Sequence, residues 1–217
     1  MAIRGWNGAW LLALAVLAGP ASAVTLGQKV TFQDGTTDSW ISGGPNPNPP
    51  LNIANGGPAG AGDRYLLVTA NGAGQGGKLV IFNLAQWTGN YLTAGVGTIG
   101  MDVDNFGATE LDLRLEFIGG AGSAYSTNPV IVPVGTGWQH VTFLVTPSAL
   151  TGSAATALGA TTELRLYHGD AAALNVVAQL GIDNVTAAAV PEPSPALSLT
   201  AGLAALFVIA RRRRRPG

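Results

Sequence analysis

Apolar and polar residues alternate with a period of two along much of this chain, which predicts β-strands rather than helices. Residues 111–117 read LDLRLEF, so the apolar side chains point to one face and the charged ones to the other. Residues 163–167 (ELRLY) and 99–104 (IGMDVD) follow the same scheme. We therefore predict strands, in chain order, over residues 29–32, 65–70, 78–83, 98–105, 111–118, 130–134, 139–145, 163–168 and 177–185.

Turn-forming residues separate these short strands, and no stretch between them keeps a helical period, which favours an all-β fold, a two-sheet antiparallel β-sandwich. Residues 43–50 (GGPNPNPP) cannot pair inside a sheet and predict a surface loop. Residues 147–160 are small and alanine-rich, which fits either a loop or one helical turn. If their strands are neighbours, the outward-facing charges would pair across the sheet: Asp102, Asp104, Arg114 and Arg165.

The N-terminus has the pattern of a secretory signal peptide. Arg4 gives a positive start, residues 10–17 form an apolar core, and Ala21 and Ala23 fit the small-residue cleavage site. We predict that residues 1–23 are removed by signal peptidase after entry into the export machinery, and that the mature chain starts at Val24. An uncleaved N-terminal anchor is the alternative.

The C-terminus combines a proline spacer, an apolar run and a block of positive charge. Pro191, Glu192 and Pro193 precede residues 194–210, which hold no charged side chain. As a helix these 17 residues would cover about 25 Å, at the short end of what spans a bilayer core. We therefore predict a transmembrane helix over residues 194–210. The arginines that follow would stay in the cytoplasm and retain the tail there: Arg211, Arg212, Arg213, Arg214 and Arg215.

These three elements in this order resemble the PEP-CTERM tail of Gram-negative bacterial surface proteins. The resemblance covers residues 190–217 only. It implies an inner-membrane-anchored precursor, processing near the Pro-Glu-Pro motif by a membrane-embedded exosortase, and a mature form at the cell surface or in an extracellular matrix. The alternative is an ordinary tail-anchored protein with a proline linker.

The body between the two signals, residues 24–189, has the length of one domain and is large enough to bury a core. It holds five lysines and arginines against eleven aspartates and glutamates, so its net charge is −6. This acidity argues against nucleic acid as a partner and suits neutral sugars or a bound cation. The absence of cysteine excludes a thiol nucleophile, a thiolate zinc site and an iron–sulfur cluster.

Parts of the body resemble jelly-roll carbohydrate-binding modules: residues 32–40 (FQDGTTDSW), Trp138 before a strand, and residues 180–185 (LGIDNV). The resemblance implies adjacent first and last strands with a structural calcium beside them; another kind of β-sandwich is the alternative. Asp34 and Asp183 are the candidate calcium ligands, since calcium prefers carboxylate and carbonyl oxygens. Otherwise Asp34 bonds to its own turn and Asp183 points to solvent.

Broad aromatic faces are the candidate sugar contacts. Trp40, Trp87 and Trp138 each fit either stacking on a sugar ring or packing in the core. Trp40 stands beside the proline loop, which favours an exposed position. Tyr167 shares an outward face with Glu163 and Arg165, which is either a polar binding surface or a solvated strand face.

Catalysis has little support in the sequence, and we predict that the protein is not an enzyme. His140 and His168 stand without a catalytic motif and fit structural roles. Asp102 and Asp104 lie two residues apart on one face, but a glycosidase also needs a defined carboxylate separation and one raised pKa. No glycine-rich phosphate loop leads from a strand into a helix.

The leading hypothesis is an exported surface or matrix protein that an exosortase sorts and processes, associated with exopolysaccharide or biofilm. The alternative is a carbohydrate-binding module with a specific glycan ligand. A polysaccharide hydrolase that uses Asp102 or Asp104 has the least support.

Overall fold

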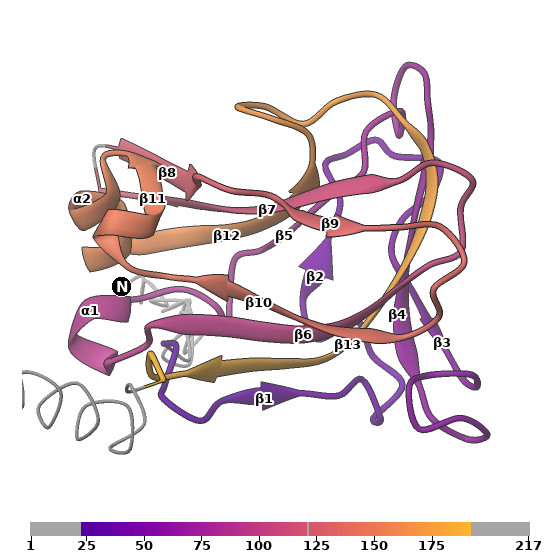
Figure 1. Cartoon of the computed structure of the whole chain (residues 1–217), viewed down its shortest axis with the longest axis horizontal. Helices are drawn as coiled ribbons and strands as arrows, with labels where there is room; N and C mark the ends of the chain where they lie inside the picture. Colours follow the sequence, from indigo (N-terminus) through magenta and orange to yellow (C-terminus); the bar gives the residue numbers. More distant parts are fainter. Residues whose placement is uncertain (1–22, 121, 192–217) are drawn as a thin grey trace, which may run out of the picture.

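The protein is an all-β sandwich of two antiparallel sheets packed face to face (Figure 1), as the alternation predicts. This computed structural model describes residues 23–120 and 122–191. Within those ranges no helix is long and apolar enough to cross a bilayer. The apolar run 194–210, the five arginines, Ala21, Glu192 and Pro193 lie outside the described residues.

One sheet has six strands in the order β10-β6-β13-β4-β3, with β1 also paired to β13. Its strands are β1 (Lys29–Val30), β3 (Leu51–Ile53), β4 (Tyr65–Asn71), β6 (Thr98–Asn105), β10 (Gln139–Leu144) and β13 (Val177–Ala188). Because β1 pairs with Val185 and Thr186, the first and last strands lie side by side, as the resemblance to jelly-roll modules implies.

The other sheet has seven strands in the order β11-β8-β7-β12-β5-β2, with β9 paired to β7. Its strands are β2 (Trp40–Ile41), β5 (Val80–Asn83), β7 (Leu111–Gly119), β8 (Gly122–Ser126), β9 (Val130–Val132), β11 (Leu150–Gly152) and β12 (Thr161–His168). The strands β7 and β12 form its centre and pair from Leu113 to Gly119 of β7, with one irregularity near Thr161.

Short helical segments gather at one end of the sandwich (Figure 1). They are α1 (Tyr91–Ala94), the 3-10 turn η1 (Pro147–Ala149) and α2 (Ala154–Gly159). Asn90 begins α1 by accepting a hydrogen bond from the Thr93 amide, and Gly95 ends it with a φ of 71°. The described chain also begins and ends here: the Val24 amide donates to the Thr88 carbonyl at 2.7 Å, and β13 ends at Ala188.

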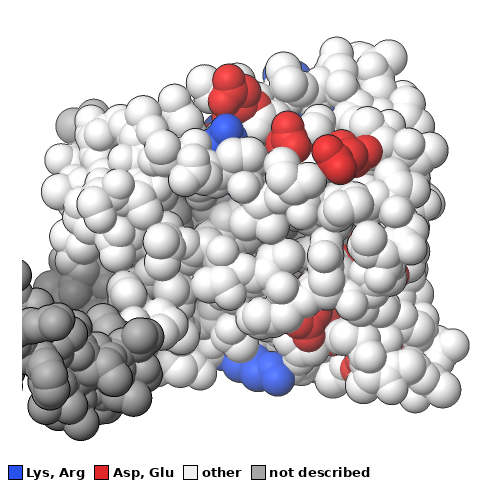
Figure 2. All heavy atoms as spheres, in the orientation of Figure 1, with Lys and Arg blue, Asp and Glu red and all other residues white. Residues whose placement is uncertain are grey.

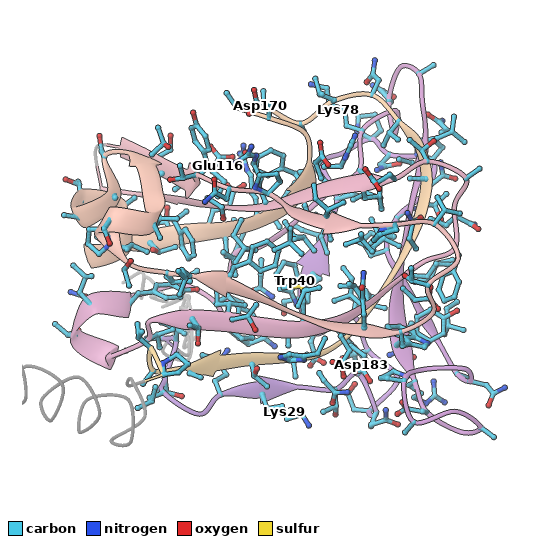
Figure 3. All side chains as sticks on the ribbon, viewed as in Figure 1. Lys29, Trp40, Lys78, Glu116, Asp170 and Asp183 are labelled. Carbon is cyan, nitrogen blue, oxygen red and sulfur yellow. The ribbon has the colours of Figure 1, made fainter. Side chains whose placement is uncertain are left out.

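The inward faces of both sheets form one apolar core. Leu113, Leu115 and Phe117 are fully buried, which confirms the faces that the alternation predicts for β7. Trp40 and Trp87 belong to this core, with ring centroids 6.5 Å apart, and Figure 3 shows Trp40 between the two layers.

The expected charge pairs across strands do not form as predicted, because β6 belongs to one sheet and β7 and β12 to the other. Asp102 instead contacts His140 at 2.7 Å, from the neighbouring β10. In the other sheet, Arg165 pairs with Glu116 at 3.3 Å.

Candidate functional site

A row of side chains crosses the outer face of the seven-stranded sheet from edge to edge. Each strand in the order β2-β5-β12-β7-β8-β11 contributes one residue, and each residue is the registered partner of the next. The row consists of Ile41, Phe82, Arg165, Glu116, Tyr125 and Thr151. A charged centre is therefore flanked by one half-buried aromatic ring on each side, Phe82 and Tyr125.

The charged centre is one arginine held by two carboxylates. Arg165 contacts Glu116 through Nη1 at 3.3 Å and Glu163 through Nε. Burial lowers the pKa of Arg165, but the hydrogen bonds and charges of Glu163 and Glu116 outweigh it, so the pKa is raised above its usual value. The Arg165 side chain is still 36 % exposed, so this centre is open to a ligand.

A short loop after β12 forms one wall of the site. Arg114, on β7, donates from Nε to the Gly169 carbonyl at 3.1 Å and pairs with Asp170 at 3.2 Å. Its Nη1 also donates to the carbonyls of Ser126 and Thr127. Because Arg114 is itself nearly buried, it fixes this loop to the sheet and to the end of β8.

Tyr167 lies on the outward face, as predicted, but at the base of this wall. Its hydroxyl donates to the Asp170 carbonyl at 2.9 Å, and burial raises its pKa to about 12. Only 2 % of its surface is exposed. Tyr167 therefore shapes the site and does not offer a free ring face for stacking.

Part of this row lines a groove of about 390 Å³, within the range of roughly 300–1,000 Å³ that ligand sites occupy. Tyr125 is not part of its lining and continues the row beside it, as the registered partner of Glu116. The lining of the groove includes Lys78, Phe82, Glu116 and Arg165, with Ala171, Ala172 and Ala173 from the loop. Figure 3 shows Glu116, Asp170 and Lys78 on this outer side of the sheet. The groove offers hydrogen-bond donors, acceptors and apolar ring surface, a combination that suits a polyhydroxylated ligand.

The predicted tryptophan contacts are corrected by the structure. Trp40 is buried, not exposed beside the proline loop, because its strand β2 turns the ring into the core. Trp138 instead lies on the outer face of the six-stranded sheet, where it packs edge-on against Tyr65 and Phe106. These rings cover Gly181, where a Cβ would come within 2.8 Å of both Phe106 and Trp138.

The two candidate calcium ligands lie in different surroundings. Asp34 is exposed and accepts hydrogen bonds from the amide and hydroxyl of Thr36, which is the turn that the alternative reading describes. Asp183 is only 1 % exposed, contrary to the alternative that it points to solvent. Within residues 23–120 and 122–191, no group of three or more histidine, cysteine, aspartate or glutamate residues is placed to hold a metal ion.

Burial raises the pKa of Asp183 to about 6, with smaller contributions from the charges of Asp63 and Asp102. Its Oδ1 atom is buried without a hydrogen-bond partner, and its Oδ2 accepts from the Asn184 side chain at 3.2 Å. Asn184 sits at an irregularity of β13 with a φ of 50°, and its side chain donates a hydrogen bond to Asp102.

The remaining candidate catalytic residues lie away from the groove. Asp102 accepts from Asn184 at 2.7 Å and contacts His140, and burial raises the pKa of Asp104 on the same outer face of β6. His168 accepts a hydrogen bond at Nδ1 from the Asp112 amide at 2.9 Å, and burial lowers its pKa. Each histidine thus has a structural partner.

No protein-family model matches the sequence, and no curated protein does. Among solved structures, the chain is similar to a family 11 carbohydrate-binding module from Clostridium thermocellum, solved in complex with a β-1,3-1,4-mixed-linked tetrasaccharide. The TM-score is 0.51 at 11 % identity, and the match covers 78 % of this chain and 99 % of the module. The body has the fold of a carbohydrate-binding module.

An exo-β-agarase gives a TM-score of 0.58 at 10 % identity, over 76 % of this chain. The chain spans only 26 % of that agarase, whereas it covers 98 % of a second structure of the family 11 module, from a cellulosomal cellulase, at a TM-score of 0.50. The chain thus covers the two family 11 carbohydrate-binding modules almost whole, but only about a quarter of the agarase.

Sequence reasoning identified Arg165, Glu163 and Tyr167 as one face, but it missed Phe82 and Tyr125. Residues 79–83 read LVIFN, without the alternation that would mark Phe82 as outward; the structure places it between the buried Ile81 and Asn83. Tyr125 lies on β8, which the sequence analysis did not predict.

Proposed function

We propose that the body is a non-catalytic carbohydrate-binding domain whose ligand lies in the groove on the seven-stranded sheet. The observation that carries the proposal is the row across this sheet, with a charged centre between Phe82 and Tyr125. Aromatic rings stack on the apolar faces of sugars, while arginine and carboxylate groups bond to hydroxyls. The fold of carbohydrate-binding modules supports this reading over the purely structural role.

Neutral polysaccharide is the ligand class that this site favours. Arg165 is already neutralised by Glu116 and Glu163, so the centre presents hydrogen-bonding atoms without a surplus of positive charge for an anionic glycan. The first glucan to test is β-1,3-1,4-mixed-linked, since the family 11 module was solved with such a tetrasaccharide. Agarose is the second, because of the likeness to part of an agarase.

The test is affinity electrophoresis and calorimetry of the protein with mixed-linked β-glucan and with agarose. Tyr125→Ala and Phe82→Ala should each weaken binding about tenfold, which corresponds to about 1.4 kcal/mol. Phe106→Ala is the matched control, because Phe106 is an exposed ring on the opposite sheet. Binding that survives Tyr125→Ala and Phe82→Ala but is lost in Phe106→Ala would move the site to the other face. The absence of binding to any neutral glycan tested would overturn the glycan proposal.

The C-terminal sequence supports a second part of the proposal, that the body is exported, anchored and then processed. The proline spacer, the apolar run and the arginine block follow one another in the sequence, and they support this part together with the N-terminal signal pattern. In this reading the span 194–210 stops transfer, an exosortase acts near Pro191, Glu192 and Pro193, and the released body joins an exopolysaccharide matrix.

Mass spectrometry of the mature protein from its native host tests the sorting reading. The expected chain starts at Val24 and lacks the arginine tail; an intact C-terminus would overturn processing. Replacing the Pro-Glu-Pro motif with alanines should leave membrane insertion intact and let full-length precursor accumulate. Normal release of that variant would reduce the motif to a linker.

A further inference from the structure

One end of the sandwich is built without charged side chains. Residues 23–28, 84–101, 141–162 and 184–191 contain no aspartate, glutamate, lysine or arginine. These segments include α1, η1, α2 and the end of β13. In Figure 2 the charged residues lie over the middle and the opposite end of the face in view, and the part that carries the helices in Figure 1 is uncoloured. We call this region the uncharged end.

Apolar side chains project from the uncharged end. Leu26 is 54 % exposed, Leu92 on α1 is 44 % exposed and Val190 is 46 % exposed. A shallow hollow lies between residues 23–26 and the segment from Asn90 to Ala94, so the first described residues and α1 form one continuous surface. Exposed apolar side chains on segments without charge are typical of a surface that contacts an apolar or interfacial partner.

The chain leaves the body from this same surface. The Gly97 amide donates to the Ala188 carbonyl at 2.8 Å, and the Thr98 hydroxyl donates to the Ala189 carbonyl at 3.3 Å. The body therefore holds the chain up to Ala189. Only residues 191–193 separate Val190 from the apolar run at 194–210, and even fully extended they allow a reach of about 14 Å.

We infer that the uncharged end is a docking face for the surface of a phospholipid bilayer, with Leu26, Leu92 and Val190 in the interfacial layer. This inference rests on the proposed membrane span at 194–210. With so short a tether, the body must rest against the membrane, and the end nearest the tether is the one that lacks charge. A face without lysine or arginine gains nothing from anionic headgroups, so it suits zwitterionic lipids.

The absence of cysteine allows a direct test. Leu26→Cys and Leu92→Cys, made singly in the full chain, place an environment-sensitive fluorophore at the docking face. Val177→Cys is the matched control, because Val177 is also an exposed apolar residue. It stands at the opposite end of the 12-residue strand β13, roughly 35–40 Å from Ala188.

Each labelled chain is reconstituted into phosphatidylcholine vesicles, with and without lipid that carries a spin label near the headgroup. The expected result is a loss of fluorescence at positions 26 and 92 and none at 177. Adding Leu92→Asp to the chain labelled at position 26 should restore the emission, because a charge on this face opposes contact with the interface.

Flotation of the vesicles separates the two proposals. A chain that does not float with lipid overturns the membrane span and the docking face with it. If the chain floats but the spin-labelled lipid changes the fluorescence equally at positions 26, 92 and 177, the membrane span stands and the docking face is overturned. Disulfide-linked dimers of the Leu92→Cys chain, without quenching by lipid, would assign the face to a second copy and also overturn the inference.

Discussion

Replacing Asp183 with asparagine should change how the stability of the body depends on pH. Asp183 is almost fully buried on β13, its Oδ1 atom has no hydrogen-bond partner, and burial raises its pKa to about 6 from 3.8. Asparagine has nearly the same shape but cannot ionise. The substitution therefore isolates the cost of holding a carboxylate at this position (Figure 3).

The size and sign of the effect follow from the two pKa values. A group whose pKa is higher in the folded state stabilises the fold fully below pH 3.8, and that stability is lost as the pH rises through about 6. A pKa that rises from 3.8 to about 6 corresponds to about 3 kcal/mol. Relative to the wild type, Asp183→Asn should thus gain roughly 2 kcal/mol more free energy of unfolding at pH 7 than at pH 4, because pH 4 already lies slightly above the unfolded-state pKa of 3.8.

Urea unfolding at a series of pH values, in calcium-free buffer, measures this difference. Glu110→Gln is the control, because Glu110 is exposed and its carboxyl stays in water in both states. The comparison between pH values cancels the constant cost of placing an amide where Oδ1 now has no partner. Parallel pH profiles for the wild type and Asp183→Asn would show that the carboxylate is hydrated in the folded protein and would refute the reasoning.

Three further predictions concern stability. Gly181→Ala should lower the free energy of unfolding by about 1–3 kcal/mol, because the added Cβ would meet Phe106 and Trp138 at 2.8 Å. Gly159→Ala is the control and should leave the stability unchanged, because nothing lies within 4 Å of its added Cβ. Thermal unfolding of both variants measures the difference. Arg114→Leu should lower the free energy of unfolding by about 2 kcal/mol or more, because it leaves carbonyls of the groove wall without a donor. The same substitution should weaken glycan binding measured by calorimetry. Calcium at millimolar concentration should raise the melting temperature of the wild type but not of Asp183→Asn; no rise in either would argue against the calcium prediction.

Long strands were the part of the fold that could be predicted from sequence. The predicted strand at 98–105 coincides with β6, and those at 111–118 and 139–145 differ from β7 and β10 by one residue at the end. These strands alternate apolar and polar residues because one face of each is buried. The short strands β2, β3, β8 and β11 were not predicted, since two to five residues carry too little alternation and their pairing is decided by neighbours far along the chain.

The alternation along a strand predicted which face of the sheet a side chain lies on, but it could not predict whether that side chain is exposed to solvent. Asp183 does point away from the core, yet it is buried on the outer side of its sheet. Tyr167 also faces outward, and the loop that Arg114 fixes over it removes it from solvent. The loop over Tyr167 follows it directly in the chain, but Arg114, a residue distant in sequence, holds that loop in place, and no local pattern records this contact. The candidate groove likewise depends on the register between β5, β12 and β7, which single strands do not reveal.

The position of β13 has a mechanical consequence. Its 12 residues lie in the interior of their sheet, paired with β6 on one edge and with β4 and then β1 on the other. A pulling force on the chain beyond Ala188 acts along the axis of this strand, so it loads the hydrogen bonds of both edges together in shear instead of opening them one after another. Such a strand resists tension far better than one peeled from a sheet edge. In the proposed function, it would let the body carry load between the membrane-anchored tail and a bound polysaccharide.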